Sequence, residues 1–408
     1  MNTLDAFGTE YLRIAFGIVR HFPGFIDAYV GPAELKATAE TELMSSLAEL
    51  HTRVRRLHEQ LPAQGYPETR RDYLDKQLTG IDMVLRKLQG ESVPYRQEVA
   101  ACFDIDIALE PESTFEAVRD ELEEIVPGRG SLLDRLDAWR NQYNIDNATA
   151  RTGFDLLLNE TRKRTLAIVD LPEGESVEIA FVVDKPWSGY NWYLGNAKSL
   201  VEINVDLPLR ANAMVDLTAH EGYPGHHTEH SLKDRILYQQ RGYAEHAIHL
   251  INTPECVISE GIATVAEAQI FPGDDGIVFK SDVFYPGLGL QGDPQREERI
   301  DALVGKLRAV AGNAAILRHE QGASESEVID YLMTWELTPK ERAERRFRFL
   351  DDPLWRPYIF TYFAGRDLVL DYLGPGEPSE QIERFRSVLT GQITPSWLRA
   401  HRAPSVGA

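Results

Sequence analysis

Residues 220–227 read HEGYPGHH, and this octapeptide decides how the chain must fold around it. Two histidines four residues apart lie on one face of a helix and can bind one zinc ion, with a glutamate between them as general base. Here the fourth position after His220 is Pro224, and the next histidines are His226 and His227. An unbroken helix cannot bring two of these imidazoles to one ion.

The residues between the histidines favour a break in the helix. Two glycines permit unusual backbone dihedrals, and Pro224 disfavours helical geometry in the residue before it. Looping out two residues converts the six-residue spacing between His220 and His226 into the effective four-residue spacing that one metal ion requires. His226 is therefore the predicted second ligand, and His227 is the alternative.

A second segment, TPECVISEGIATVAEAQ at residues 253–269, supplies the candidate third ligand. It begins with a Thr-Pro helix start signal, and Glu260 lies next to Gly261 inside an otherwise apolar stretch. A carboxylate in such surroundings needs a charged partner, which a metal ion would provide. Glu267, seven residues later on the same face, is expected either to orient a ligand histidine or to form a salt bridge.

The remaining histidines of this region carry a simpler interpretation. Six of the chain's 11 histidines fall between residues 220 and 249. His230, His246 and His249 are expected to be surface or packing residues, because a lone histidine is more often a satisfied structural residue than a ligand.

The composition fits a folded chain of 408 residues, 43% hydrophobic and 26% charged, which can bury a sizeable core. A formal net charge of −21 argues against binding to nucleic acid or to an anionic membrane surface, because both depend on clustered Lys and Arg. Cys102 and Cys256 lack a C-x-x-C spacing and are expected to be reduced core thiols. No apolar stretch has the length of a bilayer span, and the N-terminal residues do not resemble a signal peptide. We therefore expect a cytoplasmic location.

The pattern of apolar residues predicts a mainly α protein with a small sheet. Leucines at alternating steps of three and four between residues 43 and 88 indicate amphipathic helices, and capping boxes are expected at Ser113 and Ser324. The segments SVEIAFVVD and KSLVEINVD, between residues 176 and 206, read as strands that precede the metal-binding helix. We expect an N-terminal helical region at residues 1–170 and a catalytic region at residues 171–408, packed as one unit.

The combination of HEGYPGHH with the later SEGIATVAE is similar to the paired signature of a bacterial family, the domain-of-unknown-function family 885 (DUF 885). That family resembles the gluzincin branch of zinc metallopeptidases, and the resemblance here runs from about residue 204 to residue 365. It implies a gluzincin-like catalytic core with one zinc ion per chain, bound by His220, His226 and Glu260, and with Glu221 as base. Ile262 stands where the family usually carries an aromatic residue, which bears on the substrate pocket more than on the metal.

The same resemblance suggests two further catalytic candidates. Tyr362, followed by Gly365, matches a position where the family tends to carry a tyrosine and a glycine, and could donate to a developing oxyanion. His319 lies in a segment similar to a histidine-bearing stretch of the family. The structural alternatives are an aromatic residue in a helical core and a histidine at a helix C-terminus.

These observations predict a zinc-dependent hydrolase, a metallopeptidase that cleaves amide bonds of small peptides by Glu221-assisted attack of water. One alternative is a catalytically inactive metal-binding or ligand-binding protein of the same fold, although the retained Glu221 argues against it. Another is a metal-dependent hydrolase of a non-peptide amide or ester. The expected partner is accordingly a small peptide or small amide substrate.

Overall fold

The computed structural model describes residues 4–185, 187–206 and 208–403. Within these residues the chain is mainly helical with small sheets, which confirms the fold class expected from the sequence. The helices before the main sheet are α1 (Ala6–Val19), α2 (Ala33–Thr41), α3 (Leu47–Gln60), α4 (Glu68–Leu88), α5 (Tyr95–Phe103), α6 (Glu112–Ile125), α7 (Leu132–Asn141) and α8 (Asn147–Thr165). The strands are β1 (Ile26–Tyr29), β2 (Asn144–Ile145), β3 (Ser176–Val182), β4 (Gly189–Gly195), β5 (Lys198–Asn204), β6 (Leu209–Arg210) and β7 (Ile248–Leu250).

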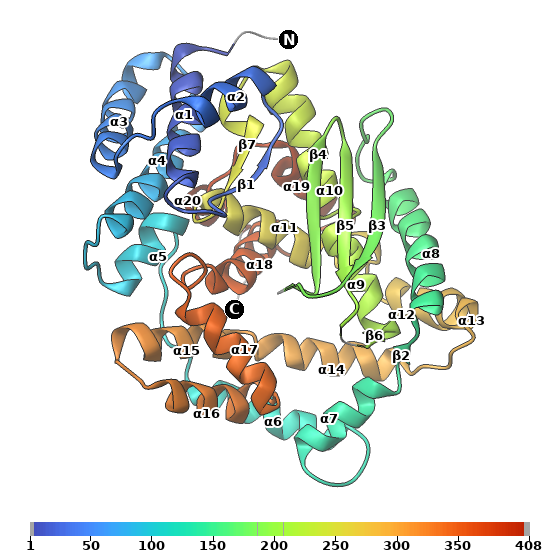
Figure 1. Cartoon of the computed structure of the whole chain (residues 1–408). Coiled ribbons are helices and arrows are strands. Elements are labelled where there is room, and N and C mark those ends of the chain that lie inside the picture. The colour runs from blue at the N-terminus through green and yellow to red at the C-terminus, as the bar shows by residue number, and fades with distance from the viewer. Residues whose placement is uncertain (1–3, 186, 207, 404–408) are drawn as a thin grey trace.

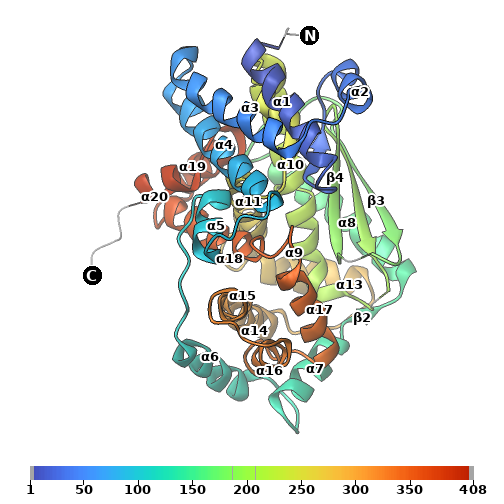
Figure 2. The ribbon, with the colours of Figure 1, turned by 60° about the vertical axis from the view of Figure 1, so that its left-hand side comes forward.

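The second half of the chain is again helical. Its helices are α9 (Ala211–Glu221), α10 (His226–Lys233), α11 (Pro254–Ile270), α12 (Asp275–Phe279), α13 (Tyr285–Gly287), α14 (Pro294–Lys306), α15 (Ala309–Glu320), α16 (Glu325–Trp335), α17 (Lys340–Asp351), α18 (Ile359–Leu373), α19 (Pro378–Thr390) and α20 (Pro395–Ala400). Two short 3₁₀ helices are η1 (Leu61–Gln64) and η3 (Ala244–Ala247), and two π-helical segments are η2 (Asp234–Gln240) and η4 (Lys280–Phe284). Helices α1–α4 lie at one end of the molecule and α6, α7 and α14–α17 at the other, with α9 and α11 between them (Figures 1 and 2).

The main sheet has three strands in the order β3-β5-β4. β3 runs parallel to β5, and β4 runs antiparallel to it, so that β4 forms one edge of this sheet. β3 and β5 are the two strands predicted from the sequence, whereas β4 was not predicted. β4 contacts α9 and α10, which places the edge of the sheet against the helices that carry HEGYPGHH.

Helix α11 lies at the centre of the larger hydrophobic core. It packs against α18 and α9, and this core also draws side chains from both expected regions, for example Phe154, Val257 and Phe360. A smaller core cluster joins α1, α3 and α4 to Ala244 and to strand β7. Cys256 is one of two buried, unbridged cysteines, as expected.

Two glycines allow α11 and α18 to cross at close range. A Cβ atom on Gly261 would lie 2.5 Å from the carbonyl oxygen of Gly365, and one on Gly365 would lie 2.2 Å from the carbonyl oxygen of Val257. Real side chains cannot be accommodated at such distances, because backbone atoms cannot yield as a side chain does. The crossing therefore depends on glycine on both helices, and it holds Glu260, next to Gly261, against the start of α18.

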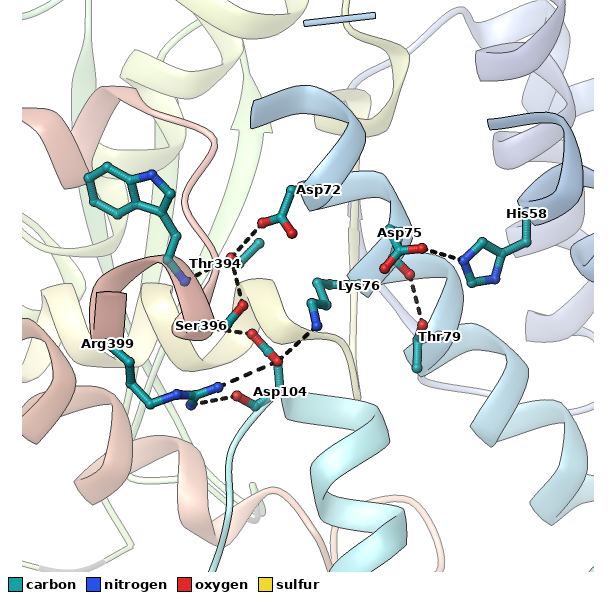
Figure 3. Close-up of polar contacts among 10 residues, drawn as sticks. His58, Asp72, Asp75, Lys76, Thr79, Asp104, Thr394, Ser396 and Arg399 are labelled. Carbon is teal, nitrogen blue, oxygen red and sulfur yellow. Dashed lines mark hydrogen bonds and ion pairs between the residues drawn. The ribbon is translucent and has the colours of Figure 1, made fainter. Parts of the chain in front are cut away.

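Polar contacts tie the C-terminal helix α20 to the N-terminal helices (Figure 3). Asp104, at the end of α5, accepts a hydrogen bond from the backbone nitrogen of Ser396 at 2.7 Å and forms ion pairs with Lys76 and Arg399. Thr394 donates to Asp72 of α4 at 2.9 Å. The two ends of the described chain are thus parts of one packed structure.

Candidate metal centre

The backbone breaks within HEGYPGHH, as the sequence predicts. Helix α9 ends at Glu221, and α10 begins at His226. Between the two helices the Tyr223–Pro224 peptide bond is cis, and the Gly225 nitrogen donates to the carbonyl oxygen of Ala219 at 2.9 Å. A Cβ atom at Gly225 would lie only 2.0 Å from the carbonyl oxygen of the first histidine of the motif, so this path requires glycine.

The break brings three of the predicted ligands together. Within the described part of the chain, His220, His226 and Glu260 form the one group of three or more histidine, cysteine or acidic residues whose ligand atoms all lie within 4.8 Å of one another. Nε2 of His220 lies 3.5 Å and Nε2 of His226 lies 4.0 Å from Oε2 of Glu260. Donors bound tetrahedrally to one zinc ion are about 3.4 Å apart. The donor set and its spacing therefore fit a zinc ion.

The two oxygens of Glu260 have different surroundings. Tyr358 donates to Oε1 at 2.9 Å, whereas Oε2 is buried and has no hydrogen-bond partner among the described residues. Burial alone raises the pKa of Glu260, but His220 and His226 lower it below its usual range. A buried carboxylate oxygen that lacks a hydrogen bond and faces two imidazoles offers a ligand atom to a cation.

The pKa of His220 depends on burial and on two nearby carboxylates, those of Glu260 and Glu221. Burial lowers its pKa, but contact with Glu260 and the nearby charge of Glu221 outweigh that effect and raise the pKa to about 9. His220 and His226 face each other edge to face, with ring centroids 4.8 Å apart. Both rings therefore lie close to the one carboxylate, that of Glu260, with which they would share a metal ion.

Glu221 lies close to the ligand group, next to His220 in sequence. Glu221 is only 7% exposed. Burial raises the pKa of its carboxyl, although His220 and His226 partly oppose that shift. Asn191 of β4 donates to the backbone carbonyl of Glu221 at 2.6 Å. A Cβ atom on Gly189 would lie 3.3 Å from Oε1 of Glu221, so the edge strand passes directly against the carboxylate.

His227, the alternative ligand, makes other contacts. Its Nδ1 lies 2.8 Å from Oγ of Ser199, and its Nε2 lies 3.1 Å from Oε2 of Glu175, in a fully buried setting. Its ring also packs edge to face on Tyr223. Both ring nitrogens are therefore engaged on the side of the sheet, and the structure places His226 in the ligand group instead.

Two tyrosines, Tyr358 and Tyr362, belong to the segment that packs against the helix of Glu260. Tyr362 lies one helical turn after Tyr358 on α18, and their ring centroids are 5.7 Å apart. Burial raises the pKa of Tyr362, and the charges of Glu260 and Glu221 raise it further. The sequence singled out Tyr362 but not Tyr358, although the four-residue spacing of the two tyrosines was a usable signal.

Tyr190 and Asp27 form a second polar pair that sequence reasoning missed. Tyr190, on β4, donates to the carboxylate of Asp27, on β1. Burial raises the pKa of Asp27 above its usual range, although the Tyr190 hydrogen bond and the charges of His249 and His226 partly oppose that shift. Asp27 lies nearly two hundred positions before HEGYPGHH in the sequence, and no local pattern marks this pair.

His319 is not brought to the ligand group. Its Nε2 lies 2.7 Å from the carbonyl oxygen of Leu350, and its ring packs against Tyr95 with centroids 4.7 Å apart. These contacts fit the alternative reading of a histidine near a helix C-terminus, whose carbonyl partner comes from α17. Glu267 pairs with the buried Lys280 at 3.4 Å, which is the salt bridge that the sequence allowed.

The other histidines of the region pack against aromatic rings, including those of other histidines. His230 stacks on His226, with centroids 5.7 Å apart, and meets His249 edge to face at 4.2 Å. His246 is buried and stacks on Tyr73. Packing is therefore the role that their contacts show.

Comparisons with known proteins identify solved structures of similar fold but no matching family. No family model matches the chain, and no curated protein sequence matches it significantly. A solved structure described as a "putative lipoprotein" from Colwellia psychrerythraea is 16% identical, with a TM-score of 0.55, over 90% of this chain and 68% of that chain. This similarity shows a shared fold.

Two further solved structures are more distant. One, described as a "putative lipoprotein of unknown function" from Shewanella oneidensis, is 13% identical with a TM-score of 0.49, over 96% of this chain and 82% of that one. The other is an M32 carboxypeptidase from Deinococcus radiodurans R1. It is 10% identical with a TM-score of 0.39, over 98% of this chain and 95% of that chain. Among the residues that the structure describes, no helix is both long and apolar enough to cross a bilayer.

Proposed function

We propose that the protein is a zinc-dependent hydrolase, a metallopeptidase that cleaves amide bonds of small peptides. The observation that carries this proposal is the placement of the buried Glu221 beside a group of two partly buried histidines and one buried glutamate. A metal-binding protein without turnover needs the ligands His220, His226 and Glu260 but has no use for a buried carboxylate next to them.

The residues divide the chemistry among them. His220, His226 and Glu260 would hold the zinc ion, which when bound polarises the substrate carbonyl and makes water a stronger nucleophile. Glu221 takes a proton from the attacking water and passes it to the leaving amine as the C–N bond breaks. Tyr362 is the candidate donor to the developing oxyanion, because the hydroxyl of Tyr358, just before α18, already donates to Glu260.

Metal content and peptide digestion test the proposal together. Protein expressed with sufficient zinc should contain one zinc ion per chain by elemental analysis, and it should cleave members of a peptide library. Cleavage should stop with a chelator and return with added zinc. Hydrolysis of small amides or esters without any peptide cleavage would replace the peptidase assignment, and a metal content near zero would overturn the hydrolase itself.

We further propose that the chain is a divergent member of DUF 885, on the strength of HEGYPGHH and SEGIATVAE. A cytoplasmic location and a small peptide substrate complete the proposal. Cell fractionation checks the location, and recovery of the protein in the membrane fraction would contradict it.

A further inference from the structure

A chain of buried hydrogen bonds leads away from His226 on the side opposite the metal ligands. Nδ1 of His226 lies 3.0 Å from Oγ of Ser259. The Ser259 hydroxyl donates to Oε2 of Glu229 at 2.6 Å, and Nζ of Lys233 donates to the other oxygen, Oε1, at 2.6 Å. The residues behind the histidine are 8%, 1% and 2% exposed, so water does not compete for these contacts.

The chemistry of these atoms fixes the direction of each hydrogen bond. An ionised carboxylate only accepts, so the single hydroxyl hydrogen of Ser259 is committed to Glu229. Oγ of Ser259 can then only accept from His226, which places a hydrogen on Nδ1. The ammonium of Lys233, which also lies 3.6 Å from Glu255, donates to the other carboxylate oxygen of Glu229.

We propose that Ser259 and Glu229 are positioning residues that hold His226 in the Nδ1–H tautomer, with the lone pair of Nε2 free on the side of Glu260. The inference rests on the proposed function for what Nε2 binds, since a neutral imidazole binds metal only through an unprotonated nitrogen. Helix α11 thus has two tasks at adjacent positions: Glu260 is a ligand, and Ser259 orients a ligand of the neighbouring helix.

The neighbouring histidine offers a matched control. His227 makes the same kind of contact, from its Nδ1 to Oγ of the buried Ser199 at 2.8 Å, but lies outside the ligand group. Ser259→Ala and Ser199→Ala each remove one hydroxyl and one serine–histidine hydrogen bond. Only the first should affect the metal, and Ser259→Thr, which restores the hydroxyl, should recover most of the loss.

The first measurement is zinc affinity, by competition with a chromophoric chelator. We expect Ser259→Ala to bind zinc about 10- to 100-fold more weakly than the unmodified protein, as for other groups that orient metal-bound histidines. Ser199→Ala should keep the original affinity, and circular dichroism should show both variants folded. Undiminished affinity in Ser259→Ala, or an equal loss in Ser199→Ala, would overturn the inference.

The second measurement is independent of zinc and of turnover. In the metal-free, ¹⁵N-labelled protein, NMR correlations of the neutral His226 ring should show hydrogen on Nδ1, and Ser259→Ala should lose that preference. Hydrogen on Nε2 in the unmodified protein would refute the positioning role. A protein that binds no zinc yet shows the Nδ1–H form would refute the proposed hydrolase while supporting the arrangement inferred for His226, so the two failures are distinguishable.

Discussion

At the scale of single residues, Glu221 separates an enzyme from a metal-binding protein. Glu221→Gln keeps the size of the side chain and a hydrogen-bonding oxygen but removes the basic group. We expect normal folding and full zinc content, because the ligand group does not include Glu221. Turnover should fall at least about 100-fold, the lower bound for general acid–base catalysis. Steady-state rates and elemental analysis on the same preparation check both parts, and an unchanged rate would locate the base elsewhere.

The adjacent histidines of the motif make a second pair of predictions. His226→Ala should lose most of the bound zinc, because it removes one of three protein ligands. His227→Ala should keep the zinc but lower the melting temperature, because it empties a fully buried position and removes the hydrogen bonds that His227 makes with Ser199 and Glu175. Zinc content and thermal unfolding of the two variants decide the question. A greater loss of zinc in His227→Ala would reverse the ligand assignment.

The site residues that could be predicted from the sequence are those whose expected roles follow from local sequence patterns. His220, Glu221 and His226 follow from one octapeptide and a count of looped-out residues, and Glu260 follows from a carboxylate in an apolar helix. Ser259 could not be identified in this way, because a serine inside a helix has no pattern that reveals its partner. Its role depends on the distance between two helices, which only the folded chain defines.

At the scale of elements, the crossing of α11 and α18 has a strict requirement for glycine. Gly365→Ala would place a Cβ atom 2.2 Å from the carbonyl oxygen of Val257, so the helices must move apart. We expect a loss of about 1–3 kcal/mol in the free energy of unfolding, as for other overpacked cores. Zinc affinity should also fall, because α11 carries Glu260 and α18 follows Tyr358, which donates to it.

Gly305→Ala is the matched control for that prediction. Gly305 also lies in a helix, α14, but a Cβ atom there meets nothing within 4 Å. Alanine is the better helix former by about 1 kcal/mol, so this variant should be as stable as the unmodified protein or more stable. Denaturant unfolding of the two variants compares them directly. Equal stability of both would show that the close crossing does not constrain the molecule.

Local signals predicted some elements and missed others for identifiable reasons. The capping box at Ser324 is present, whereas the one expected at Ser113 is not, because α6 begins earlier, after Pro111. Strand β4 was not predicted, because GYNWYLG lacks the alternation of apolar and polar residues and carries several aromatic residues instead. The break between α9 and α10 was predictable, because glycine and proline act on the backbone locally.

At the scale of the whole molecule, the site is assembled from segments that are distant in sequence. The ligands come from α9, α10 and α11, while Tyr358 precedes α18 and the pair of Asp27 and Tyr190 joins β1 to β4. Helical periodicity indicates which faces are buried, but not which helices meet. The zinc site should therefore be coupled to global folding, because a ligand that links several helices stabilises all of them at once.

Zinc should accordingly raise the stability of the entire fold. A ligand that binds only the folded state adds about 2.7 kcal/mol when its free concentration is 100 times its Kd, so we expect the melting temperature to rise by a few degrees. His220→Ala should abolish this rise, because it removes a ligand. His319→Ala should lower the melting temperature with and without zinc yet keep the rise, because the described contacts of His319 are with Leu350 and Tyr95. Differential scanning calorimetry at several zinc concentrations measures all three. Loss of the zinc-dependent rise in His319→Ala would connect this histidine to the metal site after all, whereas an unchanged rise in His220→Ala would place the bound zinc elsewhere.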